Sequence, residues 1–505
     1  MLGGERVEDT PSLPGGGRGY HPRVAARDGQ AYLRGLADGR EVWHAGQRVA
    51  DVTREPRLAR GAASVAMLYD AQVDPATRDL VTWEDKSGER QPVAFLPPRT
   101  LADLQRRRAA FQTTASLSGG VLGRTPDYIN TFVLACAANH AYFARNDAAY
   151  GENARRYLEH CQRNDLCLTH TFVAPQIDVA AARRNQADRE TALRVVEERD
   201  EGIVVRGARI LATLAPIADE VVVVRQAAGD CALAFAVPMA TPGLRIICRE
   251  SLDEGRATFD RPLSSRFDEV DAYLIFQDVL VPWERVFLHD PEGKHATLFS
   301  ETTAYTHVIH QFTTRNWVKA QLMLGVAHAM AETVGASEIP AVQETLGEMV
   351  AVVETLRALL VASEAEAEPD VEGLIVPRRE TLRTARSYFP RQYGRLVEIL
   401  QRVGSSGLLT TPTDAELAED LPIAADVATY FRGIKTDARA RAALFRLGWD
   451  LCASSFAGRH ALYERHFAGS PEGTLARQYR AYDRGPALAL VQRLLGSGQQ
   501  VPGSS

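Results

Sequence analysis

The chain has 505 residues, of which 45% are hydrophobic and 24% charged, a composition typical of a globular protein. Its length predicts two or three domains that share a large core. The net charge of -6 leaves no basic footprint for nucleic acid. Because no apolar run approaches the roughly 18 residues of a membrane span, and residues 1–29 lack the build of a signal peptide, we expect a cytoplasmic protein with no membrane partner.

The two ends of the chain differ in composition and periodicity from residues 30–165. Residues 1–29 and 491–505 are rich in Gly, Pro or Ser without apolar periodicity, which predicts flexible tails. Residues 30–165 contain runs with apolar side chains at three- and four-residue spacing, such as DLQRRRAAFQTTASLSGG and INTFVLACAANHAYFARN. This spacing predicts an N-terminal α-helical domain.

The middle of the chain has the pattern of strands. Between residues 166 and 299, short β-branched or aromatic runs are separated by Gly, Asp and Pro, which predicts a central β-sandwich or barrel domain. The runs are GIVVRGARIL, DEVVVVRQ, CALAFAVPM, GLRIICRE and AYLIFQDVLVP.

After Ser300 the helical period returns and holds to about residue 490. Several long amphipathic helices in sequence predict an antiparallel C-terminal bundle over residues 300–490. Gly335 is the expected cap of its first long helix. The next helix is expected to place one set of apolar side chains on a single face: Leu346, Met349, Val350, Val353, Leu356 and Leu360.

This order of an α domain, a β domain and a helical bundle resembles the α+β plan of the acyl-CoA dehydrogenase-like fold. The resemblance implies a flavin between the β domain and the bundle, although a fold alone does not give a function. GGVLGR at residues 119–124 is a poor dinucleotide-binding motif, because it follows helical segments and not a strand.

Three side chains stand out for their chemistry. His170 lies between two threonines in the otherwise apolar run NDLCLTHTFVAPQID, and a histidine in such a run is more often a core residue with satisfied hydrogen bonds. Arg124 and Tyr128 are four residues apart and would share one face of a helix, where they could be only a surface pair. The spacing by itself favours these structural alternatives.

Five motifs change that balance, because they occur in the order and spacing of the HpaB family of two-component flavin monooxygenases. The motifs are GRTPDYIN, DLCLTHTFVAPQID, GARILATLAPIADE, FDEVDAYLIFQDVLVPWERVF and SSFAGRHALYERHFAGS. The chain resembles the oxygenase component of this family from about residue 30 to the C-terminal helices. The resemblance implies an enzyme that uses reduced FAD and O₂ to hydroxylate a phenol ortho to its hydroxyl, through a flavin C4a-hydroperoxide.

The family's site residues can be placed on this chain one by one. Arg124, Tyr128 and His170 would surround the phenol and the flavin ring. Arginine supplies a fixed cation for a phenolate, and a histidine whose pKa lies near the working pH would favour the phenolate. The resemblance further implies FAD contacts from a larger set: His170, Thr171, Phe172, Gln176, Thr213, Ser454, Ser455, Phe456 and Ala457. From its sequence context alone, Thr213 could equally be an exposed strand residue, and residues 454–457 could be a simple helix break.

The chain departs from the family after ATLAPIADE. Small hydroxyl residues are common there, whereas this chain places Arg225 and Gln226 near the position that touches the substrate carboxylate. Our hypothesis is that Arg225 recognises a larger or differently charged substrate, such as an amino acid or a carrier-bound aryl group. An arginine at a strand end that points to water is an equal alternative. The charges of Arg459, Glu464 and Arg465 could form a solvated face or a subunit contact, and we expect the solvated face.

Competing functions on the same fold are a 4-hydroxybutyryl-CoA dehydratase and an acyl-CoA dehydrogenase, or a variant monooxygenase that oxidises nitrogen or removes halogen. The dehydratase needs a cysteine ligand for its iron-sulfur cluster near the start of the bundle, and the sequence has no cysteine between Cys248 and Cys452. We therefore expect no metal. The resemblance implies a separate flavin reductase as partner and a homotetramer.

Overall fold

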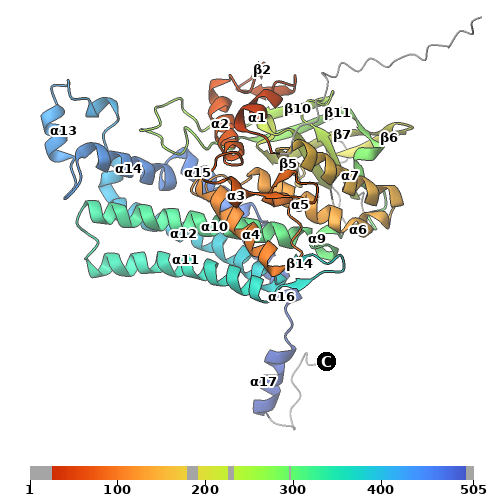
Figure 1. Ribbon diagram of the computed structural model, residues 1–505. Coiled ribbons are helices and arrows are strands. Elements are labelled where there is room, and N and C mark those ends of the chain that lie inside the picture. The colour runs from red at the N-terminus through yellow and green to blue at the C-terminus, as the bar shows by residue number, and fades with distance from the viewer. Residues whose placement is uncertain (1–25, 179–190, 226–231, 295–296, 496–505) are drawn as a thin grey trace, which may run out of the picture.

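The structure is a computed structural model that describes residues 26–178, 191–225, 232–294 and 297–495. Helices come first in the chain, strands follow, and a long helical bundle ends it (Figure 1). The predicted tails fall largely outside the described residues. Of the predicted C-terminal tail, residues 491–495 belong to a helix that ends at Leu495, and the rest lies outside the described residues. The domain limits themselves remain a prediction.

The first third is built mainly from helices, as predicted. A small antiparallel pair, β3 (Thr82–Glu84) and β4 (Arg90–Pro92), lies among them. Helix α4 begins with a capping box in which Thr100 and Asp103 satisfy each other's backbone N–H groups. The helices are α1 (Gly29–Gly35), α2 (Pro56–Asp70), α3 (Arg78–Val81), α4 (Leu101–Ser116), α5 (Pro126–Ala138), α6 (His140–Ala144) and α7 (Ala148–Asn164).

A hairpin in this region corrects the prediction of helices alone. Strands β1 (Glu41–His44) and β2 (Gln47–Val49) are joined by Ala45 and Gly46, which have φ of 49° and 77°, the left-handed pair that a tight hairpin turn uses. Strand β1 pairs in parallel with β10 (Leu244–Cys248) and so joins the central sheet. Strands this short carry too little periodicity to be recognised.

The middle third consists of two sheets, and it contains the strands predicted for it. One sheet has the order β2-β1-β10-β11-β7-β6 and the other β12-β9-β8-β5. Phe235 and Phe276, from opposite sheets, pack edge to face with ring centroids 5.9 Å apart. The remaining strands are β5 (Leu168–Thr171), β6 (Arg194–Arg199), β7 (Gly202–Thr213), β8 (Glu220–Arg225), β9 (Ala232–Pro238), β11 (Asp271–Pro282) and β12 (Val286–Asp290).

The bundle follows a short helix, α9 (Leu298–Glu301). Helix α10 ends as predicted, because Gly335 has a φ of 72° and the N–H of Ala336 donates to the carbonyl of Ala331 at 2.8 Å. On α11 the predicted apolar face is buried except for Val350, which is 45% exposed. The main helices are α10 (Ala304–Thr333), α11 (Pro340–Ala365), α12 (Arg379–Thr410), α14 (Ala438–Cys452) and α15 (Ser455–His466).

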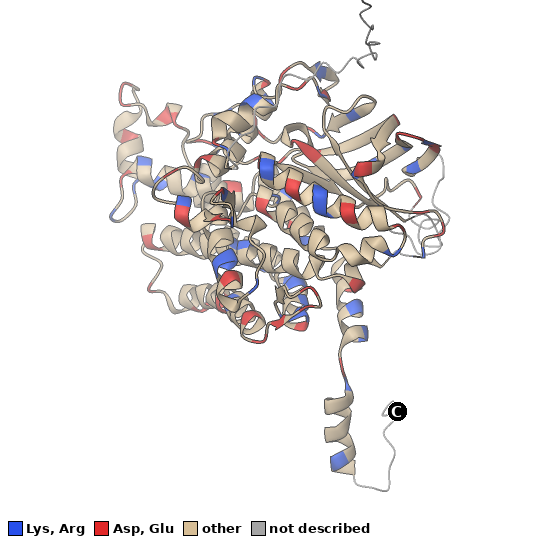
Figure 2. Ribbon diagram, turned by 45° about the vertical axis from the view of Figure 1, so that its right-hand side comes forward, with Lys and Arg blue, Asp and Glu red and all other residues tan. Residues whose placement is uncertain are grey.

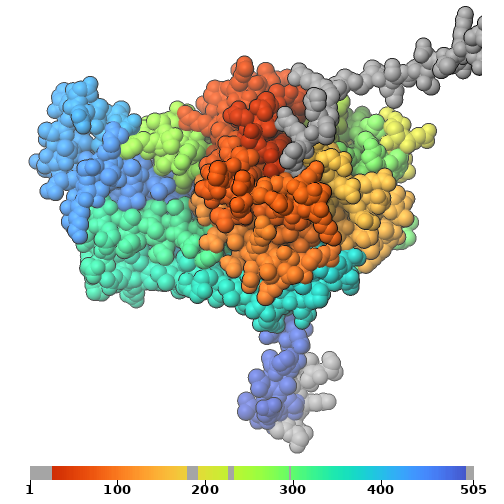
Figure 3. Space-filling view, viewed as in Figure 1, coloured from red at the N-terminus to blue at the C-terminus, as the bar shows by residue number. Residues whose placement is uncertain are grey.

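The last two helices are α16 (Pro471–Ala481), which contacts α12, and α17 (Gly485–Leu495), which stands away from the body of the molecule (Figures 1 and 3). Charged residues of both signs are interspersed over the helices (Figure 2). Within the described part of the chain, no helix combines the length and apolar character needed to span a bilayer.

Candidate functional site

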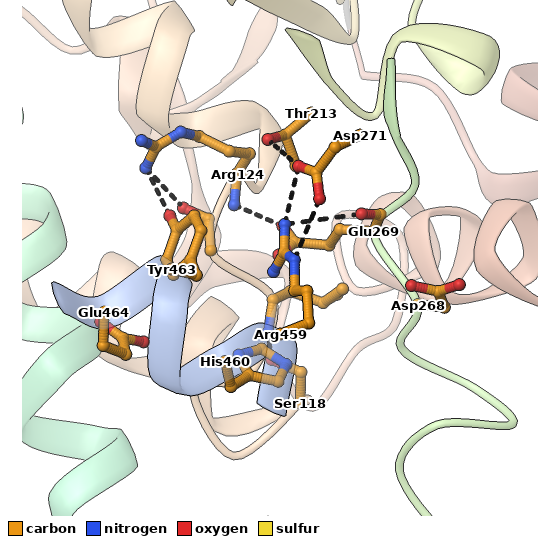
Figure 4. Close-up of polar contacts among 12 residues, drawn as sticks. Ser118, Arg124, Thr213, Asp268, Glu269, Asp271, Arg459, His460, Tyr463 and Glu464 are labelled. Atoms are coloured by element: carbon orange, nitrogen blue, oxygen red, sulfur yellow. Dashed lines mark hydrogen bonds and ion pairs between the residues drawn. The ribbon is translucent and has the colours of Figure 1, made fainter. Parts of the chain in front are cut away.

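Arg124 is held at the start of α5 by contacts from the other two parts of the molecule. Its backbone N–H donates to Oε1 of Glu269 at 2.6 Å, and its Nη1 donates to the hydroxyl of Tyr463 on α15 at 2.5 Å (Figure 4). The guanidinium lies over the Tyr128 ring, 4.2 Å from its centroid, and close to the rings of Tyr463 and Phe467. The structure therefore brings a buried cation onto the face of a buried phenol.

His170 lies on β5, directly beside this pair. Its ring centroid is 5.3 Å from that of Tyr128 and 4.4 Å from that of Phe172. Three side chains that the family resemblance assigned to one site, Arg124, Tyr128 and His170, thus meet although they come from two elements. His170 is only 7% exposed, and its Nδ1 has no hydrogen-bond partner among the described residues.

The protonation of His170 differs from the sequence prediction. Burial lowers the pKa of His170 well below its usual 6.5, and the positive charge of Arg124 lowers this pKa further. The imidazole is therefore neutral at working pH, and its pKa does not lie near that pH. The cation of Arg124, and not the titration of His170, is the group that would favour an ionised phenol.

Further aromatic rings extend this site. Phe132 on α5 packs against Phe172 with centroids 5.7 Å apart, and Phe299 on α9 lies 5.4 Å from Phe172 on another side. Tyr305 packs edge-on to Phe299 at 5.5 Å. We call these four rings together with Tyr128 and His170 the aromatic cluster.

Thr213 joins the site through a charge network. Its Oγ1 donates to Oδ1 of Asp271 at 2.6 Å, and Asp271 accepts two hydrogen bonds from Arg459 on α15, at 2.9 and 3.1 Å (Figure 4). Arg459 also donates to Oε2 of Glu269 at 3.1 Å, the carboxylate that holds the backbone of Arg124. Burial would raise the pKa of Asp271, but Arg459 and Arg249 hold that pKa well below its usual range.

A second buried network lies on the other side of α15. Glu464 accepts hydrogen bonds from Arg315 at 2.5 and 2.8 Å and from Lys319 at 2.9 Å, with all three side chains at most 1% exposed. The predicted solvated face is therefore wrong for Arg459 and Glu464 and right for Arg465, which is exposed. Their partners lie more than a hundred residues away in the sequence, so the helix alone gave no sign of them.

The other residues expected at the flavin lie at different distances from the aromatic cluster. Phe172 belongs to it, whereas Thr171 is buried and donates to the carbonyl of Ile210 at 2.9 Å, and Gln176 is exposed on the segment after β5. Ser454 caps the N-terminus of α15, and residues 454–457 lie at the end of this helix opposite to Tyr463.

Arg225 does not join the cluster. Strand β8 pairs with β5 in parallel, with Thr171 opposite Val223, so Arg225 lies on the same sheet face as Thr171 and on the opposite face from His170. Its Nη1 donates to the carbonyl of Leu193 at 3.0 Å. Gln226 lies outside the described residues.

The sequence reasoning missed Tyr463, Glu269 and Asp271, which position Arg124 and Thr213. Two signals were present: Arg459 and Tyr463 are four residues apart on a helix, and three acidic residues stand at the start of an otherwise apolar strand run, DEVDAYLIF. Pairing them required knowledge of which elements pack together.

Two family models match the chain: 4-hydroxyphenylacetate 3-hydroxylase N terminal over residues 28–288 and C terminal over residues 295–496. The 4-hydroxyphenylacetate 3-monooxygenase oxygenase component of Thermus thermophilus is 39% identical, covering 94% of this chain and 98% of that protein. A Streptomyces globisporus monooxygenase that acts on a (3S)-3-amino-3-(3-chloro-4-hydroxyphenyl)propanoyl group on a peptidyl-carrier protein is 32% identical, covering 88% of this chain and 85% of that one.

Solved structures of the same family also match this chain. The HpaB oxygenase component complexed with FAD and 4-hydroxyphenylacetate superposes with a TM-score of 0.89 at 38% identity, covering 93% of this chain and 98% of that chain. An archaeal 4-hydroxybutyryl-CoA dehydratase has a TM-score of 0.82 but only 18% identity, covering 95% of this chain and 97% of that chain, so it shares the fold alone.

Proposed function

The chain belongs to the 4-hydroxyphenylacetate 3-hydroxylase (HpaB) family, and on this premise we propose that it is the oxygenase component of a two-component monooxygenase. Reduced FAD from a separate reductase and O₂ would be its co-substrates, and a phenol would be hydroxylated ortho to its hydroxyl. The observation that carries the proposal is the meeting of Arg124, Tyr128 and His170 in one buried aromatic cluster.

The residues present fit a flavin. The isoalloxazine ring has apolar faces and a polar edge, and the half-buried ring of Phe172 is followed in the chain by the exposed apolar side chains of Val173 and Ile177. The unpartnered Nδ1 of His170 is a buried polar atom that a ligand would satisfy. We propose that His170, Thr171, Phe172, Gln176 and Thr213 hold the ring, and that residues 454–457 contact the more distant part of FAD.

Bound reduced flavin would supply the chemistry that activates O₂. The chain's own residues would prepare the phenol: Arg124 would stabilise its oxygen as an anion, and the neutral imidazole of His170, in the tautomer that carries its proton on Nδ1, would donate a hydrogen bond to that oxygen. An ionised phenol is electron-rich at the ortho carbon, which is the position to be hydroxylated. The surrounding rings would exclude water from the reacting atoms.

The proposal is tested by supplying chemically reduced FAD, air and 4-hydroxyphenylacetate to the purified protein and measuring the dihydroxy product. Arg124→Gln should lower the rate of hydroxylation roughly 10- to 150-fold, because a hydrogen bond to a charged group contributes about 1.5–3 kcal/mol. Arg441→Gln is the matched control, since Arg441 also lies over a ring, that of Phe445, on a distant helix. A wild-type protein that forms no dihydroxy product from any phenol tested would refute the proposal.

The proposed partners have their own support. Helix α17 has no buried residue, and its exposed apolar side chains include Leu490, Val491, Leu494 and Leu495. Such a helix is stable when another surface covers it, which supports the proposed homotetramer.

Whether the phenol is free or bound to a carrier protein, as for the Streptomyces relative, is settled by comparing both forms in the same assay. The cytoplasmic location remains a prediction.

A further inference from the structure

Two guanidinium groups from different helices converge on one point beside the C-terminal end of α15. Arg386 lies on α12 and Arg477 on α16. A methyl group placed on Gly469 would lie 3.2 Å from Nη2 of Arg477 and 3.6 Å from Nη2 of Arg386. Gly469 has a φ of 97°, a backbone conformation that suits glycine, and it leaves room between the two groups.

This arginine pair has no acidic complement. Arg386 donates to the carbonyl of Ala468 from both Nε, at 3.1 Å, and Nη2, and Arg477 donates to Oγ1 of Thr474 at 3.2 Å. Throughout the described ranges 26–178, 191–225, 232–294 and 297–495, neither forms an ion pair with a carboxylate. By contrast, the buried Arg315 and Arg459 are each matched by carboxylates.

The like charges of the pair act on each other. Although Arg477 is exposed by its surface area, partial desolvation by neighbouring groups lowers its pKa, the charges of Arg386 and Arg480 lower this pKa further, and the phenol of Tyr305 opposes the change. Two cations kept close together without a counter-charge repel, and an anion between them would relieve the repulsion. Arginine also offers paired N–H donors that match the oxygens of carboxylates and phosphates.

The pair lies at one edge of the aromatic cluster. The guanidinium of Arg386 lies over the ring of Tyr305, 4.8 Å from its centroid, and Tyr305 packs against Phe299, which packs against Phe172. Burial raises the pKa of the Tyr128 phenol, and the charge of Arg386, like that of Arg124, opposes this rise. The charge of Arg386 therefore reaches the centre of the proposed active site.

We propose that Arg386 and Arg477 form an anion-binding subsite that takes the carboxylate or phosphate group of a molecule whose ring lies against the aromatic cluster. The inference rests on the proposed function, because that function supplies two such molecules: an acidic phenol, with its carboxylate, and FAD, with its phosphates. In either case the subsite fixes the charged end of a ligand while Arg124 and His170 act at the other end. It would take over the role that the sequence alone suggested for Arg225.

The test compares charged and neutral ligands on Arg386→Gln and Arg477→Gln. Equilibrium binding is measured by protein fluorescence for 4-hydroxyphenylacetate against 4-hydroxyphenylethanol, and for FAD against riboflavin, which lacks phosphate. Loss of about tenfold or more in affinity for the acidic phenol, with the neutral phenol unchanged, assigns the subsite to the substrate. The same selective loss for FAD over riboflavin assigns it to the cofactor.

Two further variants make the result decisive. Arg477→Lys should restore most of the lost affinity because it keeps the charge, and Arg484→Gln, at another exposed arginine that lies over a tyrosine ring, should change nothing. Arg477 is itself exposed, so its substitution leaves the fold intact even where that of Arg386 does not. Unchanged affinity for both anionic ligands in Arg477→Gln overturns the inference. A wild-type protein that binds these ligands but forms no dihydroxy product refutes the proposed function instead.

Discussion

Replacing Glu464 with Gln should destabilise the protein strongly. Glu464 pairs with both buried cations Arg315 and Lys319, and Gln has nearly the same shape, so the change removes charge and little volume. Removal of one partner from a buried ion pair costs roughly 3–5 kcal/mol, because it leaves buried charge without compensation. The free energy of unfolding should fall by that amount.

A matched control is available in the same bundle. Glu348 on α11 accepts two hydrogen bonds from Arg395 on α12, at 2.7 and 2.8 Å, but the two side chains are 46% and 33% exposed. Glu348→Gln should therefore cost about 1 kcal/mol or less. Urea unfolding followed by the fluorescence of Trp317 and Trp449, which lie on bundle helices, measures both variants. Equal losses for the two would refute the reasoning that burial sets the magnitude.

The pH dependence of the same pair gives a second check. Burial would raise the pKa of Glu464, but Arg315 and Lys319 hold it at about 2. The unfolded carboxyl has a pKa of about 4.3. A depressed pKa contributes stability that is present above the unfolded value and is lost as the pH falls towards 2, so wild type should approach Glu464→Gln in stability at acid pH.

Two further predictions concern the pH dependence set by buried histidines and the role of the Tyr463 hydroxyl. His170, His307 and His460 all have pKa values held well below 6.5 by burial, so each stays neutral when folded and takes up a proton when unfolded. Their contribution to stability should be constant above about pH 6.5 and fall below it, by up to roughly 4 kcal/mol per pH unit for the three together, and a flat urea midpoint between pH 7 and 5.5 would contradict this. Tyr463→Phe removes the hydroxyl that accepts from Arg124 and should lower the rate of hydroxylation roughly tenfold with the fold unchanged, so wild-type kinetics in this variant would show that Tyr463 does not position Arg124.

The parts of the fold that depend on local pattern could be predicted from the sequence. Long β7 and β11 alternate or run apolar over twelve residues each, and α10 to α12 carry a sustained helical period. The short strands β1 and β2 could not, because their sheet partner β10 lies about two hundred residues further along the chain. Pairing at that separation leaves no local signal.

The residues of the candidate site also divide into those that could be predicted from the sequence and those that could not. Arg124, Tyr128 and His170 could be found because they fall in motifs that resemble those of the HpaB family, whereas their spacing alone favoured structural roles. Arg459 and Glu464 could not be placed, because the groups that pair with them are distant in the sequence: Glu269 just before β11 and Asp271 at its start for Arg459, and cations on α10 for Glu464. The family pattern placed Arg225 near the position that touches the substrate carboxylate, but the strand register turns it to the sheet face opposite from His170.

The most direct test of the central claim is a single turnover. The protein is mixed anaerobically with one equivalent of reduced FAD and a phenol, oxygen is added, and the flavin absorbance and the products are measured. The account predicts close to one dihydroxy product per flavin oxidised in wild type, and a large loss of that product with continued flavin oxidation in His170→Ala. Rapid flavin oxidation that yields only hydrogen peroxide in wild type, with or without phenol, would contradict it.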